Sequence, residues 1–113
     1  MKITNTYNIT DKKDFVRANN DAKAVIDFKN ITVKVSGIIF GTTTNKEGDE
    51  VKTVIIKTAN GEFIGTISPT MVESMEVVAD VFEDEIADGA KDMDVIIKTG
   101  KSHAGREYYY ASI

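Results

Sequence analysis

The chain of 113 residues has no cysteine, no tryptophan, one proline and one histidine. The absence of cysteine excludes disulfides, thiolate nucleophiles and zinc-ribbon sites. A single histidine, His103, excludes a multi-histidine metal site and a Cys/His nucleophile pair. No run approaches the roughly 20 apolar residues of a membrane helix, and the first residues lack the apolar core of a signal peptide. We therefore expect one globular domain, with the cytoplasm as its compartment.

The charge of the chain is unevenly distributed. A net charge of −4 argues at first against nucleic acid, because phosphate binding normally needs a basic surface. However, residues 68–92 hold eight acidic residues against Lys91 alone, so this segment carries −7 and the rest of the chain +3. The acidity is local and leaves a basic surface possible elsewhere.

Three strands are predicted in the first half of the chain. Residues 31–40, ITVKVSGIIF, alternate apolar and polar side chains until Gly37, which predicts a strand with a bulge at the glycine. Residues 51–58 form a second, β-branched strand. Asn60-Gly61 favours a tight hairpin turn into a third strand at residues 62–67.

A helix is predicted to begin at Ser68-Pro69-Thr70. Ser68 can cap it, Pro69 suits the first helical position because it lacks an N–H, and Thr70 with Glu73 offers an alternative capping box. One apolar stripe follows at helical spacing; it consists of Met71, Met75, Val78 and Phe82. Two further strands are expected at residues 93–100 and 106–113, joined by a turn.

The resulting order is three strands, a helix and two strands. This is the order of the OB-fold, a five-stranded Greek-key barrel that binds oligonucleotides or oligosaccharides, although other small α+β proteins share parts of it. We expect a mainly β fold with one central helix over residues 31–113. Residues 1–30 are predicted to be a partly helical N-terminal extension packed on that domain, with an early edge strand.

Motifs for catalysis and for metal binding are weak. The TGKS at residues 99–102 ends like a phosphate-binding P-loop, but Val95 stands where that motif needs glycine and a strand follows. The acidic residues 83–94 lack the spacing of an EF-hand loop, and no serine has a base and an orienting acid beside it. We expect no enzyme, no cofactor and no metal.

A binding surface is the remaining possibility. Proteins that hold single strands combine a basic groove along the backbone with aromatic rings under the bases. The candidate nucleic-acid-binding residues are Lys34, Lys46, Lys52, Lys57, Phe63, Lys98, Lys101, His103, Arg106, Tyr108 and Tyr110. The alternative role of any single lysine is to give solubility and to protect a strand edge. His103 is alternatively a solvated turn residue, and Phe63 is alternatively part of the core.

Alternation divides the three adjacent tyrosines at the end of the chain. Tyr109, Ala111 and Ile113 share one face and are expected inside. Tyr108 and Tyr110 then face outward near the basic turn, where they either stack on bases or cover neighbouring strands. Phe28, Phe40 and Phe82 are expected in the core.

These segments resemble a known family. KTVIIKTANGEFIGTISPT, then an acidic helix and a terminal GKSHAGREYYYASI, are similar to the small single-stranded-DNA-binding proteins of tailed phages of Gram-positive bacteria. The resemblance covers about the last two-thirds of the chain. It implies an OB-like protein without cofactor that coats displaced strands in replication or recombination. The chain lacks the flexible acidic tail of bacterial relatives, which puts tail-mediated recruitment of host partners in doubt.

The sequence therefore predicts a protein that binds single-stranded DNA with little sequence preference and keeps strands unpaired and protected during phage DNA replication or recombination in the host cytoplasm. Replication or recombination proteins are the expected partners, and the protein is expected to be a monomer or a small homo-oligomer. The alternative is a protein-binding OB module, such as a phage assembly or host-inhibitor protein. RNA and oligosaccharide binding stay open.

Overall fold

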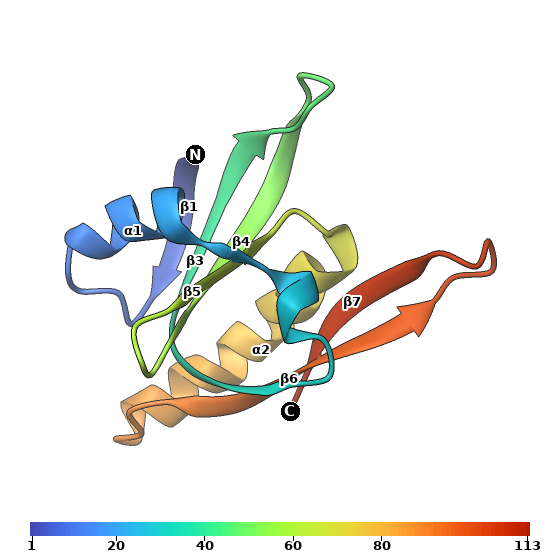
Figure 1. The fold of residues 1–113 in the computed structure, drawn as a ribbon. Coiled ribbons are helices and arrows are strands. Elements are labelled where there is room, and N and C mark those ends of the chain that lie inside the picture. The colour runs from blue at the N-terminus through green and yellow to red at the C-terminus, as the bar shows by residue number, and fades with distance from the viewer.

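A computed structural model describes all 113 residues and is mostly β, with two α-helices (Figure 1). The elements in chain order are β1 (Lys2–Tyr7), α1 (Lys13–Asp21), β2 (Lys23–Ala24), the 3₁₀ helix η1 (Val25–Phe28), β3 (Thr32–Thr44), β4 (Glu50–Thr58), β5 (Phe63–Thr66), α2 (Pro69–Ala87), β6 (Met93–Lys101) and β7 (Glu107–Ser112). Neither α-helix has the length and apolar character needed to cross a membrane.

The long strand β3 organises one strongly curled sheet. Six strands follow one another in the order β2-β5-β4-β3-β6-β7, and β1 also pairs with β3. On one edge of β3, the first residues pair with β6 and the later ones with β1. The other edge pairs with β4 from Val35 onward. Because β3 serves two partners in succession on one edge, the sheet curls into a half-barrel.

The predicted bulge in β3 is confirmed, at Ser36, directly before Gly37. The register against β4 shifts between Val35 and Gly37, and the Ser36 hydroxyl lies 3.1 Å from the carbonyl oxygen of Thr58. A Cβ on Gly37 would come within 2.4 Å of Ile9 Cδ1. The glycine therefore allows the N-terminal segment to pass close to the bend.

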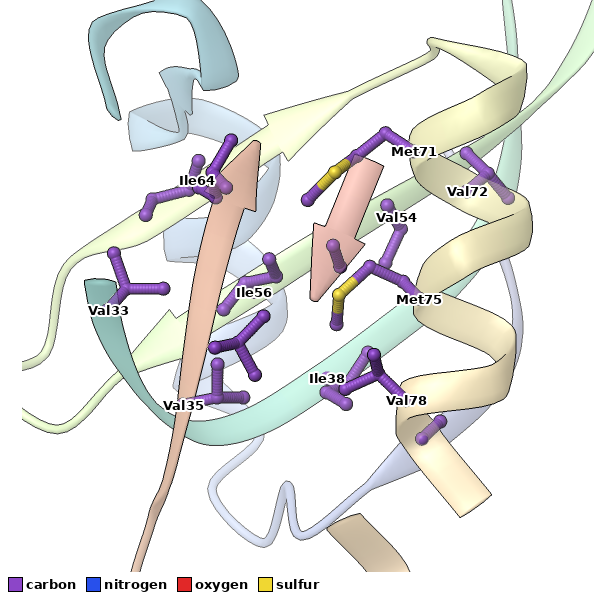
Figure 2. Close-up of a cluster of buried hydrophobic side chains, with 14 of the residues drawn as sticks. Val33, Val35, Ile38, Val54, Ile56, Ile64, Met71, Val72, Met75 and Val78 are labelled. Atoms are coloured by element: carbon purple, nitrogen blue, oxygen red, sulfur yellow. The ribbon is translucent and has the colours of Figure 1, made fainter. Parts of the chain in front are cut away.

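The main core lies on the concave side of the sheet and is covered by α2. Pro69 begins the helix, as predicted, and the Met71 and Met75 side chains point from it toward β4 and β3 (Figure 2). The helical stripe predicted from the sequence is confirmed, because Met71, Met75, Val78 and Phe82 are all buried. Of the predicted core phenylalanines, Phe40 and Phe82 are buried and Phe28 packs partly buried against the cluster.

The half-barrel does not close between β5 and β7. The outer edge of β5 is occupied by β2, which pairs with it in parallel at Lys23–Ile64 and Ala24–Gly65. The outer edge of β7 is met by α2 instead, because Ser74 Oγ accepts the Ala111 N–H at 2.7 Å and Thr70 Oγ1 donates to the Tyr109 carbonyl at 2.8 Å. These two side-chain hydrogen bonds from α2 take the place of the pairing between β5 and β7 that a closed barrel would need.

Several local predictions need correction. The Ser68 side chain does not cap α2. The Thr70 hydroxyl donates to the Tyr109 carbonyl of β7 and does not form a capping box. Ile113, expected inside, is 66% exposed because β7 ends at Ser112, its last paired residue. In the N-terminal extension, the predicted edge strand is β1, and the predicted helical part consists of α1 and the short η1.

Candidate nucleic-acid interface

The β6–β7 hairpin presents two tyrosines on its outer face. Tyr108 pairs with Gly100 and Tyr110 with Lys98, and paired residues in an antiparallel ladder share one face. Tyr109 and Ala111, on the opposite face, pack against or within the main core. The predicted division of Tyr108 and Tyr110 from Tyr109 is therefore confirmed.

The two outward tyrosine rings form one aromatic surface. Their centroids are 6.1 Å apart and their planes are tilted by 39°. The Tyr108 ring lies over Gly100, where an added Cβ would come within 2.6 Å of the ring. Any larger residue at position 100 would displace this ring. Both side chains are half-buried, so each is supported by the hairpin while part of its surface stays in solvent.

One basic side chain lies beside this aromatic pair and three more lie at the tip of the hairpin. Lys98 is the cross-strand neighbour of Tyr110. Lys101, His103 and Arg106 lie at the tip, which turns through Gly105 at a φ of +76°, and Lys101 pairs there with Glu107, on the face opposite the two tyrosines. None of these four groups makes an ion pair. The charges of Lys98 and Arg106, and that of Lys101 at the tip, are therefore available to an external phosphate.

The other predicted lysines are differently placed. Lys34 lies 3.2 Å from the Asp94 carboxylate and Lys52 lies 3.8 Å from that of Glu76 on α2, so both are partly neutralised. Lys46 is exposed and unpaired, but it lies at the tip of the β3–β4 hairpin, well apart from the tip of β6–β7 (Figure 1). The structure therefore does not gather these three lysines beside the tyrosines.

Lys57 and Phe63 are covered by α1. Phe63 is only 4% exposed and packs with Ala18, Ile39 and Ile55 in a second apolar cluster on the convex side of β4 and β5. Lys57 donates to the buried Asp14 carboxylate at 2.7 Å. Phe63 is therefore a core residue and not a stacking platform. Lys57 is paired with Asp14 and holds α1 against the sheet.

A hydrogen-bonded chain fixes the inner side of β7. Lys29 Nζ donates to Glu107 Oε2 at 2.9 Å, and the Tyr109 hydroxyl donates to Glu107 Oε1 at 3.2 Å. The hydrogen bond from Lys29 lowers the pKa of the Glu107 carboxyl and raises that of the Lys29 ammonium. Burial, with the neighbouring Glu107, raises the pKa of the Tyr109 phenol.

The cover over β4 and β5 could have been anticipated from the sequence. Val54, Ile55 and Ile56 are consecutive apolar residues, and all three are buried. Such an uninterrupted run is typical of a strand with both faces covered. The supporting role of Ser74 carries no comparable signal, because it depends on Ala111, which is distant in the chain.

No group of His, Cys, Asp and Glu side chains in the chain is placed to hold a metal ion. In comparisons with known proteins, no family model, curated protein or solved structure matches the chain. The candidate site therefore depends on its own geometry.

Proposed function

We propose that this protein binds single-stranded DNA with little sequence preference, on the outer face of the β6–β7 hairpin. The observation that carries the proposal is the pair of half-buried rings, Tyr108 and Tyr110, 6.1 Å apart beside Lys98. Aromatic rings stack on any base, and lysines and arginines neutralise any phosphate, so such a surface needs no particular sequence.

The expected binding energies agree with a surface that uses both aromatic stacking and phosphate neutralisation. Stacking contributes roughly 1–3 kcal/mol per base, so two rings supply about 2–6 kcal/mol. A micromolar dissociation constant corresponds to about 8 kcal/mol. The unpaired cations Lys98, Lys101 and Arg106 must therefore supply a substantial part, which makes binding sensitive to salt.

The order of strands β3 to β7 around α2 supports an open form of the OB-fold, and we propose this as the fold. Its acidic helix lies across the concave side, whereas the tyrosines are on the outer face of the hairpin. The proposed role is occupancy: bound protein keeps strands unpaired and shielded during phage DNA replication or recombination, as the sequence resemblance suggests. No bond is made or broken.

Titration of fluorescently labelled oligo-dT at low salt tests this proposal. We expect saturable binding at micromolar protein and a much weaker response to the same length of duplex DNA, whose bases are not free to stack. An absence of binding to oligo-dT under these conditions would overturn the proposal.

A second candidate function is protein binding through α2. Val77 and Val81, one helical turn apart, are 68% and 39% exposed on an otherwise acidic helix. Exposed apolar residues beside charged ones are typical of interaction surfaces. Substitution of both valines by serine should leave oligo-dT binding unchanged if the DNA proposal is correct.

A further inference from the structure

A cleft of about 400 Å³ opens beside the first residues of β3. Its apolar walls are Phe28, Ile31, Val33 and Ala59. Ile31 is 47% exposed at its mouth. A cleft of this size falls within the range that small ligands occupy. Its apolar walls favour a ligand that has a flat apolar face.

The cleft exists because β3 and β4 are no longer paired there. Their last hydrogen bond runs from the Ala59 N–H to the Lys34 carbonyl at 2.9 Å, after which the chain turns at Gly61 with a φ of +87°. Thr32 and Val33 pair with β6 on one edge, but β4 does not reach them on the other. The cleft therefore meets a strand edge that carries peptide groups, and its polar lining consists of Thr32, Lys34, Thr58, Asn60 and Glu62.

One lining residue of the cleft, Thr32, lies on the same outer face of the sheet as Tyr110. Thr32 pairs with Ile96, and Ile96 pairs with Ser112 of β7, two residues along from Tyr110. Two strand spacings of about 4.8 Å and two residues of about 3.3 Å place Thr32 roughly 12 Å from Tyr110. Thr32, Ile96 and Tyr110 alternate with the buried Val33, Val95 and Ala111, so they face the same outer side.

We infer that this cleft holds one base of the same single strand whose neighbouring bases stack on Tyr108 and Tyr110. The base lies with its faces against the apolar walls and turns its polar edge toward the peptide groups of β3. A nucleobase combines a flat apolar face with hydrogen-bonding groups on its edge, which matches both features of the cleft. This inference rests on the proposed function and extends its footprint beyond the hairpin.

Photo-crosslinking with oligo-dT that contains 4-thiothymidine, mapped by mass spectrometry, tests the inference. We expect crosslinks in two regions, residues 28–34 or 58–62 at the cleft and residues 108–110 on the hairpin. Crosslinks on the hairpin alone would overturn the cleft while leaving the proposed function intact. An absence of crosslinks at both regions, together with no binding in titration, would overturn the function itself.

Two variants provide an independent measurement. Ala59→Phe, which adds a ring to the wall, should remove the cleft crosslinks and weaken binding about fivefold or more, while the hairpin crosslinks persist. Ile31→Ala alters an exposed wall without placing bulk in the fold and should weaken binding in the same direction. Ala87→Phe, on the exposed end of α2, is the matched control and should bind as the unmodified protein does. Unchanged affinity in both cleft variants would contradict the inference.

Discussion

The Ser74 hydroxyl joins α2 to the tyrosine strand: it accepts the Ala111 N–H at 2.7 Å and lies 3.0 Å from the Met71 carbonyl oxygen, to which it donates. Ser74→Ala removes both contacts and leaves a partly buried N–H without its partner. We expect a loss of about 1–2 kcal/mol in the free energy of unfolding, measured by denaturant titration. Ser112→Ala, on the outer face of β7, is the control and should change stability by less than about 0.5 kcal/mol. Equal losses in the two variants would mean that Ser74 does not hold the edge of β7.

Tyr108 and Tyr110 should contribute to DNA binding and not to folding. Each substitution by alanine is expected to weaken oligo-dT binding by about 1–3 kcal/mol, because one stacking ring is lost. Circular dichroism and the unfolding midpoint should remain close to those of the unmodified protein. Unfolding of either variant would show that its ring belongs to the core.

The salt dependence of binding counts the phosphates that the protein contacts. With Lys98, Lys101 and Arg106 each neutralising one phosphate, the slope of log affinity against log salt should be about −2. Substitution of all three by alanine should bring the slope near zero. Lys91→Ala is the control, since Lys91 is exposed, unpaired and roughly 30 Å along the chain from Lys101 at strand spacing. An equal change of slope in the control would contradict the assignment of these cations.

Lys57 is predicted to act in stability alone. Lys57→Met leaves the buried Asp14 carboxylate with only Arg17, at 3.4 Å, as its charged partner, and we expect a loss of about 1–3 kcal/mol in unfolding free energy. Asp21→Asn, at the exposed end of α1, should change stability by less than about 0.5 kcal/mol. Affinity for oligo-dT at a temperature where Lys57→Met is folded should be unchanged. A marked loss of affinity would return Lys57 to the DNA-binding surface.

The Lys29–Glu107 pair predicts a pH dependence of stability. The pKa of Glu107 lies below its usual value of 4.5 in the folded protein, so the folded state binds this proton less tightly than the unfolded state does. The contribution of the pair is therefore present at neutral pH and is lost as the pH falls through the lowered pKa. Glu107→Gln should make the acid decline of the unfolding midpoint shallower. An identical decline in the unmodified protein and in Glu107→Gln would exclude this pair as a source of the pH dependence of stability.

The sequence predicted those features that depend on neighbours in the chain. The division of Tyr108 from Tyr109 follows from strand alternation, and the start of α2 follows from Pro69, whose missing N–H costs nothing there. The buried run Val54 to Ile56 indicates that both faces of β4 are covered, but it does not say which segment covers Phe63. That segment, α1, lies more than forty residues earlier in the chain, and alternation only says that Phe63 and Ile64 face opposite sides. The open edge between β5 and β7 depends on two further long-range contacts, from β2 and from Ser74.

Intrinsic tyrosine emission during titration with oligo-dT tests the central claim most directly. The chain has four tyrosines and no tryptophan, so its emission comes from Tyr7, Tyr108, Tyr109 and Tyr110. Stacking of bases on Tyr108 and Tyr110 should quench the emission saturably in the unmodified protein. In the double variant Tyr108→Leu/Tyr110→Leu the remaining emission should not respond to oligo-dT. Equal fractional quenching in both proteins, or no quenching in the unmodified protein at saturating oligo-dT, would contradict the account.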